Sequence, residues 1–233
     1  MFGGVYVPST LTILGVIMYL RFGWVVGNVG LLGTLIIVTI STSITFLTAL
    51  SIASIATDKK VKGGGAYYMI SRSLGIETGG AVGIPLFLAQ SFSVALYVFG
   101  FAESLTIVFP ELNIKWVGII TTVFITIISL ISTKITIKSQ YFILAAIFIS
   151  ILSLVFGSPI ENSSIEMWGV PAHKSEGFWT VFAVFFPAVT GIMAGVNLSG
   201  DLKDPAKAIP KGTFLAVGTG YLIYMLLPLI LAS

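Results

Sequence analysis

Long runs of hydrophobic residues, separated by short polar connections, make up most of the chain. A helix that crosses the roughly 30 Å hydrocarbon core of a bilayer needs about 20 mainly apolar residues. Seven runs are long enough, which predicts an all-α polytopic membrane protein with about seven transmembrane helices. The predicted spans cover residues 5–27, 31–56, 80–109, 116–133, 136–157, 177–198 and 212–232.

The composition supports a lipid environment. Of the 233 residues, 56% are hydrophobic and only 9% are charged, whereas soluble domains carry about a quarter charged residues. Cysteine is absent, which excludes disulfides and thiolate metal sites, and the single histidine, His173, lies in a polar loop. We therefore expect the lipid bilayer as the main partner, and neither a cofactor, a resident metal nor a nucleic acid.

The basic residues indicate how the chain is oriented in the membrane. With a cytoplasmic N-terminus, nine of the twelve lysines and arginines fall in the inner connections, as positive charge usually does. These nine are Lys59, Lys60, Lys62, Arg72, Lys134, Lys138, Lys203, Lys207 and Lys211. The opposite orientation would place all nine outside. A cytoplasmic N-terminus is therefore preferred, and it places the sequon at 162–164 on the outer side.

Two of the predicted spans contain residues that interrupt helices. The first, "VPSTLTILGVIMYLRFGW", has Pro8 near its start and Gly15 near its middle, and the sixth has Pro187, Thr190 and Gly191. Relative to Ala, a helix interior is destabilised by about 3 kcal/mol for Pro and about 1 kcal/mol for Gly. Interrupted helices at corresponding positions of two halves are typical of a transporter binding site. Freed amides there favour an anion, and freed carbonyls favour a cation.

Close helix packing is the alternative interpretation of these small residues. Gly191 and Gly195 form a GxxxG pair, and glycine is common where membrane helices approach each other. Packing alone could explain one such segment. Two matching segments favour the binding site.

Four stretches of the sequence match one family in order and spacing. "LTILGVIMYLRFGWVVG", "KGGGAYYMISRSLG", "ALYVFGFAES" and "FFPAVTGIMAGVNLSGDLKDPAKAIPKGT" together resemble the cation–chloride cotransporter family, within the amino acid–polyamine–organocation superfamily. The resemblance implies a LeuT-like fold of two inverted five-helix repeats, with the first and sixth spans discontinuous. It implies symport of chloride with potassium, with or without sodium, across the plasma membrane by alternating access.

The resemblance also implies roles for individual residues. Oxygen atoms that hold potassium in the family match positions Thr12, Ile13, Tyr97, Pro187 and Thr190. Backbone amides that hold an outer chloride match Gly15, Val16 and Ile17, and those that hold an inner chloride match Gly191, Ile192 and Met193. No metal other than the transported alkali cation is implied. Thr12 departs from the asparagine that is common in the family, which is tolerable if the ligand is the backbone carbonyl.

The family fold has ten core spans, so this chain is expected to be one truncated transport domain, residues 1–233. It would supply the first repeat, about 5–157, and the first two helices of the second, about 177–232. The partners expected on this basis are inorganic ions, the missing C-terminal helices or a partner chain, and a second copy in a homodimer.

Three readings of the function stay open. A potassium-coupled chloride cotransporter leads, and the bulk of Ile13, Leu14 and Tyr97 at the first break favours inorganic ions over organic solutes. An amino acid or polyamine transporter on the same scaffold is the second reading, and a non-transporting fragment or accessory membrane protein is the third. An enzyme is not expected, because no nucleophile and base converge on the pathway.

Three further features lie outside the predicted binding site. Arg21 and Glu103 fall toward the outer ends of their spans, where they could form an ion pair. The segment "KKVKGGGAYYMISRSLG" predicts a short cytoplasmic or re-entrant helix that closes the inner mouth. The segment "SGDLKDPAKAIPKGT" predicts an inner loop with turns at Pro205 and Pro210.

Overall fold

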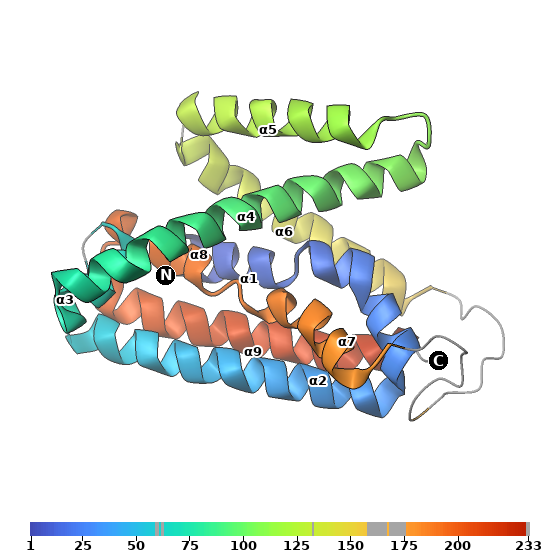
Figure 1. Ribbon diagram of the computed structural model, residues 1–233, viewed down its shortest axis with the longest axis horizontal. Helices are drawn as coiled ribbons and strands as arrows, with labels where there is room; N and C mark the ends of the chain where they lie inside the picture. The colour runs from blue at the N-terminus through green and yellow to red at the C-terminus, as the bar shows by residue number, and fades with distance from the viewer. Residues whose placement is uncertain (59–60, 62, 132, 158–166, 168–175, 232–233) are drawn as a thin grey trace.

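The computed structural model describes residues 1–58, 61, 63–131, 133–157, 167 and 176–231 (Figure 1). Every regular element in these residues is helical. The α-helices are α1 (Val7–Ile13), α2 (Val16–Asp58), α3 (Gly65–Leu74), α4 (Ile76–Val108), α5 (Ile114–Ile131), α6 (Thr133–Val155), α7 (Phe178–Phe185), α8 (Met193–Asn197) and α9 (Pro205–Leu231). Three short helices of other types join them, namely η1 (Phe2–Tyr6), η2 (Phe186–Val189) and η3 (Ser199–Asp201).

Six helical segments within the described residues are long and apolar enough to cross a membrane, and the chain is an all-α polytopic membrane protein. The first segment, Phe2–Asp58, has 57 residues and is far too long for one crossing. It divides at Gly30, whose φ of 70° and ψ of −178° are not helical. A left-handed φ is accessible to glycine because it has no Cβ. The seven predicted spans are therefore all present.

The described helices pack around one antiparallel pair (Figure 1). The C-terminal part of α2, residues 31–58, runs antiparallel beside α9, with the rings of Phe46 and Phe214 5.6 Å apart. The interrupted spans, formed by α1 with the N-terminal part of α2 and by α7 with α8, lie on this pair. Helix α4 crosses over the interrupted spans with α5 beyond it, whereas α6 passes behind α4 and packs against α1. The core is thus built around the two breaks.

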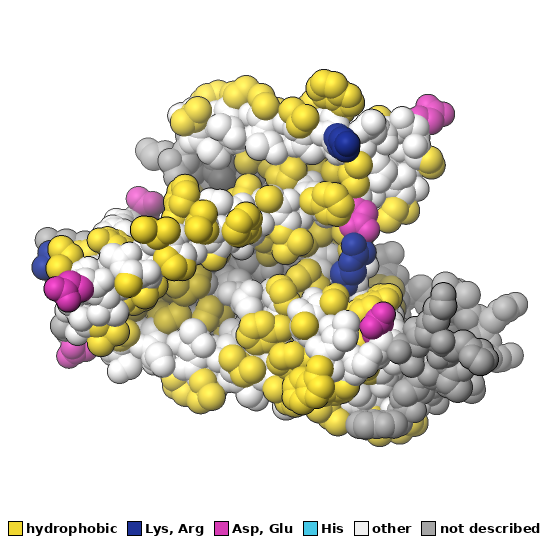
Figure 2. All heavy atoms as spheres, viewed as in Figure 1, with side chains coloured by type: hydrophobic (Ala, Val, Ile, Leu, Met, Phe, Trp, Pro, Cys, Tyr) yellow, Lys and Arg dark blue, Asp and Glu magenta, His cyan; other side chains and the backbone are white. Residues whose placement is uncertain are grey.

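The outer surface of α4 and α5 is hydrophobic (Figure 2). Phe87, Phe92 and Leu130 expose 71%, 70% and 82% of their surface, and no residue of α5 is buried. Such an apolar surface would be insoluble in water, but in a bilayer it meets lipid at no cost. The exposure of these helices therefore agrees with membrane insertion.

The prediction of an inner loop before the last span is partly wrong. Helix α9 begins at Pro205, and Pro210 lies inside the helix instead of in a turn. Proline is well tolerated at a first helical position such as 205, where the N–H has no helical partner. At position 210 it removes one hydrogen bond, to a carbonyl in the first helical turn, and the rest of the helix continues. The short helix predicted after the three glycines is confirmed as α3.

Some predictions fall on residues outside the described part of the structure. They include the sequon at 162–164, His173, and the basic residues Lys59, Lys60 and Lys62.

Candidate functional site

The first span breaks between α1 and α2. Helix α1 ends at Ile13, Leu14 has a non-helical backbone with φ −85° and ψ 39°, and α2 begins at Val16. The amide of Leu14 still donates to the carbonyl of Thr10 at 2.8 Å. The next carbonyls, of Thr12 and Ile13, lack helical partners because the helix does not continue.

Two tyrosines from other helices donate to these freed carbonyls. The hydroxyl of Tyr97 on α4 donates to the Thr12 carbonyl at 2.8 Å. The hydroxyl of Tyr224 on α9 donates to the Ile13 carbonyl at 2.6 Å. An unsatisfied buried carbonyl would cost about 1–3 kcal/mol, so both bonds stabilise the break.

The sixth span breaks between α7 and α8. The chain tightens into η2 at Pro187, leaves the helix at Thr190 and Gly191, and resumes as α8 at Met193. Because Pro187 has no N–H, the helix cannot continue its bonding pattern through this position. The hydroxyl of Thr190 donates to the Pro187 carbonyl at 2.8 Å and closes the turn.

The two breaks are in direct contact. The Thr12 hydroxyl lies 2.7 Å from the carbonyl oxygen of Gly191, and the Ser9 hydroxyl donates to the Ile192 carbonyl at 3.3 Å. Thr12 also lies within 3.0 Å of the Pro8 carbonyl and 2.9 Å of the Ser9 carbonyl in its own helix. A Cβ added at Gly191 would lie only 2.5 Å from the Thr12 Cβ.

Close packing and the helix break coexist in the sixth span. A Cβ at Gly195 would lie 2.6 Å from the Val5 carbonyl oxygen, so this glycine permits close approach of η1. The packing interpretation of the GxxxG pair therefore holds for both of its glycines. It does not compete with the break, because the same contacts bring the two broken helices together.

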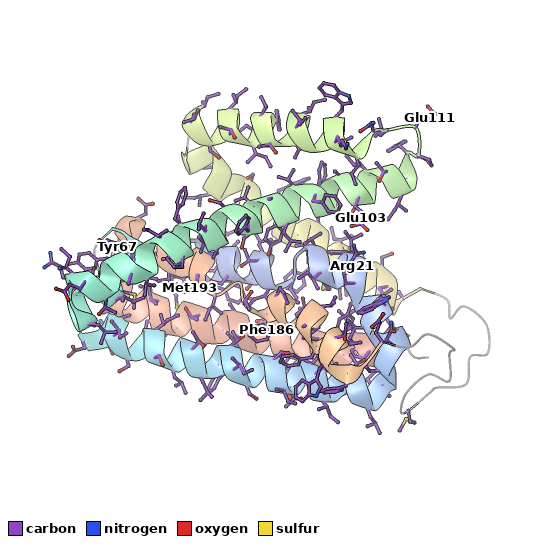
Figure 3. The ribbon with its side chains drawn as sticks, in the orientation of Figure 1. Arg21, Tyr67, Glu103, Glu111, Phe186 and Met193 are labelled. Carbon is purple, nitrogen blue, oxygen red and sulfur yellow. The ribbon has the colours of Figure 1, made fainter. Side chains whose placement is uncertain are left out.

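A cavity of about 270 Å³ lies between the two breaks and α4. Ten of the eleven residues that the family resemblance marked as ion ligands line it. These are Thr12, Ile13, Gly15, Val16, Ile17, Tyr97, Pro187, Thr190, Gly191 and Met193. Ile192 is the exception, since its side chain is 2% exposed and packs in the core. Figure 3 labels Phe186 and Met193, which lie on the two sides of the sixth-span break.

Sequence analysis missed three polar residues around the breaks. Gln90 and Ser93 line the cavity from α4, seven and four residues before Tyr97 on the same helical face. That spacing was the signal that could have found them. Tyr224 lies behind the first break and does not line the cavity. Its only signal was a hydroxyl within an apolar span.

The polar atoms around the cavity are neutral. Among the described residues no acidic or basic side chain lines it, so a bound cation would meet carbonyl, hydroxyl and amide oxygens. Hard alkali cations prefer oxygen ligands, and neutral oxygens bind them weakly enough to allow release. The amides at the start of α2 supply a partial positive charge that suits an anion. The arrangement can therefore hold ions of both signs.

An ion pair joins α2 to α4 away from the cavity lining. Nη2 of Arg21 lies 3.0 Å from both carboxylate oxygens of Glu103, which confirms the predicted pair (Figure 3). The two side chains are 43% and 26% exposed, so the pair is partly accessible.

The sequence was compared with known proteins. The family model described as amino acid permease matches residues 4–233. Solute carrier family 12 member 1 from Mus musculus is 40% identical over 239 residues, covering 92% of this chain and 22% of the relative. Solute carrier family 12 member 2 from Homo sapiens is 40% identical over 245 residues, covering 95% and 20%. The chain thus spans about a fifth of the length of these curated relatives.

These relatives are named as solute carriers. The match covers the motifs that carry the resemblance to the cation–chloride cotransporters, and it confirms that resemblance. Because the family model matches nearly the whole length of the chain, the chain belongs to the amino acid permease family.

Proposed function

We propose that this chain forms part of a plasma-membrane symporter that carries chloride together with potassium by alternating access, with sodium as an optional third ion. The observation that carries the proposal is the meeting of two helix breaks at one cavity lined by neutral oxygens and by helix-start amides. The similarity to solute carriers supports the same function.

In this proposal potassium is held by oxygen atoms around the cavity. They are the carbonyls of Thr12, Ile13 and Pro187 and the hydroxyls of Tyr97 and Thr190. The hydrogen bond from Tyr97 to the Thr12 carbonyl supports this assignment, because it brings two of the proposed ligand oxygens to 2.8 Å. Thr12 takes part through its backbone, so a side chain other than asparagine is compatible with the role.

The two chlorides are assigned to backbone amides. The outer one is proposed at Gly15, Val16 and Ile17, where α2 begins, and the inner one at Gly191, Ile192 and Met193, where the sixth span resumes. Ile192 fits this role although its side chain is buried, because an amide ligand needs no side-chain exposure.

The domain organisation, membrane orientation and partners are proposed on the same grounds. The chain would be a single transport domain, with its first repeat at about 5–157 and part of a second repeat at about 177–232. Its N-terminus would be cytoplasmic. Further helices, or a second copy in a homodimer, would complete the assembly, and no enzymatic step is involved.

Amino acid transport is a second candidate, which the description of the matching family model favours. The helix-start amides of the first break could hold an α-carboxylate. Against it, the described part of the chain places no acidic side chain in the cavity lining to meet an ammonium group. We therefore rank it below ion transport.

Uptake by the intact protein in liposomes tests the proposal. Radiolabelled chloride should enter only with potassium or rubidium present, and rubidium only with chloride. Tyr97→Phe and Thr190→Ala should each reduce this coupled uptake about tenfold or more, since each removes one proposed ligand oxygen. Thr122→Ala is the matched control, because the Thr122 hydroxyl bonds within α5 and the residue does not line the cavity.

Chloride uptake that ignores potassium and both substitutions would contradict the site. Uptake of an amino acid without ion coupling would instead support the second candidate.

A further inference from the structure

Tyr224 is a fully buried aromatic residue beside the first break. It is 0% exposed, lies on α9, and donates its hydroxyl to the Ile13 carbonyl at 2.6 Å. Ile13 is the last residue of α1 and also lines the cavity on its other side. One of the proposed cation ligands is therefore held from behind by a residue that takes no part in the cavity lining.

The ring of Tyr224 is fixed by two phenylalanines. Its centroid lies 5.4 Å from that of Phe22 and 5.2 Å from that of Phe185, and the two phenylalanine rings are 5.7 Å apart. Phe22 belongs to the first span after its break, and Phe185 to the sixth span before its break. The position of the hydroxyl is thus set by both interrupted spans together.

The hydrogen bond to Ile13 leaves this carbonyl able to take a second partner. A carbonyl oxygen has two lone pairs, and Tyr224 uses one of them from the α9 side. A donated hydrogen bond also fixes the orientation of the carbonyl and reduces the field that it presents to a cation. Preference among alkali cations depends on the number and field strength of such carbonyl dipoles.

We propose that Tyr224 is a positioning residue of the cation site, which sets the orientation and field strength of the Ile13 carbonyl and thereby the preference among alkali cations. The inference rests on the proposed function, because it requires that Ile13 contributes to a cation site. Tyr224 acts through Ile13 and does not touch the ion.

Tyr224→Phe tests this role, because it removes one oxygen atom and keeps the ring against Phe22 and Phe185. In the intact protein reconstituted in liposomes, the apparent KM should be measured for potassium, rubidium and caesium, together with the maximal rate. We expect the potassium KM to rise about three- to tenfold, the worth of one hydrogen bond, because the loss of the fixed carbonyl orientation outweighs its stronger field. The ratio of rubidium to potassium KM should also change, since the field strength changes. A purely structural role would lower the amount of folded protein and the maximal rate but leave this ratio unchanged.

Tyr221→Phe is the matched control on the same helix. Its hydroxyl lies 3.4 Å from that of Thr39, away from the Ile13 carbonyl, so the cation ratio should equal that of the wild type. If Tyr224→Phe does not reach the membrane, Phe22→Leu replaces it. That variant keeps the Tyr224 hydroxyl but loosens the packing around its ring. We expect it to change the ratio of rubidium to potassium KM in the same direction as Tyr224→Phe, by a smaller factor.

The outcomes separate the two proposals. Wild-type protein without potassium-coupled uptake would overturn the proposed function. Coupled wild-type uptake with an unchanged cation ratio in Tyr224→Phe, or in Phe22→Leu where that variant replaces it, would overturn the role of Tyr224 alone.

Discussion

The contact between Thr12 and Gly191 explains why a glycine stands at the sixth-span break. The carbonyl of Gly191 accepts from the Thr12 hydroxyl, and an added Cβ would lie 2.9 Å from the Thr12 carbonyl carbon as well as against its side chain. Glycine is required at position 191 for the close approach of two backbones and not for an unusual backbone angle, because the glycines with positive φ are at other positions.

Gly191→Ala should therefore separate the two breaks. Overpacking of this kind destabilises by about 1–3 kcal/mol, and the displaced break should also lose coupled ion uptake. Thermal unfolding of the purified protein and uptake in liposomes measure the two effects. Gly218→Ala is the control, because a Cβ there meets nothing within 4 Å and alanine is the better helix former by about 1 kcal/mol. Equal effects of the two substitutions would show that the contact at Gly191 is unimportant.

The residues of the site differ in how far the sequence could predict them. Pro187, Thr190 and Gly191 are visible because they disfavour a helix within an apolar run, and Tyr97 because of the family motif. Nothing in the local sequence identifies Tyr224 as a residue of the site. Its role depends on α9 lying against the end of α1, a contact between segments 211 residues apart that no local pattern encodes.

Among the elements, α3 is joined to the sixth span through glycines. A Cβ at Gly200 would lie 3.0 Å from the Cα of Gly63, so the two backbones nearly touch. Gly65, with φ 54°, lies against Asn197 at the end of α8. The short helix predicted to close one end of the pathway thus packs directly on the end of an interrupted span.

Gly65→Ala should weaken this contact. The new Cβ would lie 2.6 Å from Oδ1 and 3.0 Å from Cα of Asn197, and alanine is strained at a positive φ. Helix α3 must then move away from α8. A cysteine introduced at Val196, which is fully buried, should react with a small maleimide at least about fivefold faster than without Gly65→Ala.

The sequence suits this measurement because it contains no other cysteine. Gly80→Ala in α4 is the control, since a Cβ there has open space. An unchanged labelling rate in Gly65→Ala would mean that α3 does not cover Val196.

The Arg21–Glu103 pair couples two other elements, α2 and α4. Arg21→Gln and Glu103→Gln should each slow transport, and the double variant should be no slower than either, because each single change leaves one charge without its partner. A charge-swapped double variant should recover part of the rate. Turnover in liposomes measures this, and additive losses in the double variant would show that the two residues act independently.

For the whole molecule, the sequence predicted the number of spans better than their arrangement. Length and hydrophobicity alone define a span, because a bilayer imposes both. The faces by which the spans pack are harder to predict, since lipid is as apolar as a neighbouring helix and no amphipathic stripe is required. Phe46 and Phe87 illustrate this, as both are apolar residues of apolar spans, yet only Phe46 has a ring partner on another helix.

The charges of the molecule are distributed unevenly between its ends. Lys203, Lys207 and Lys211 line one cavity together with Gly3 and Gly4, so the start of α9 and the start of the chain share one end. Helix α3, which carries Arg72, lies at the same end, while Glu111 lies at the far end of α4 (Figures 1 and 3). Two regions predicted to be cytoplasmic from their basic residues, α3 and the start of α9, therefore lie at one end together with the start of the chain.

This arrangement makes the orientation testable with two reporters. A cysteine at Lys207 should react with a membrane-impermeant maleimide only after cells are permeabilised, and one at Glu111 should react in intact cells. Both side chains are exposed, so a difference in labelling reports the side of the membrane and not burial.

Labelling of both sites after permeabilisation is the internal control for expression and reactivity. The reverse pattern would place the basic end outside and contradict a cytoplasmic N-terminus. It would also exchange the inner and outer chloride assignments at the two breaks, because these assignments depend on which end of the molecule is cytoplasmic. The labelling result therefore decides which proposed anion site an ion arriving from outside reaches first.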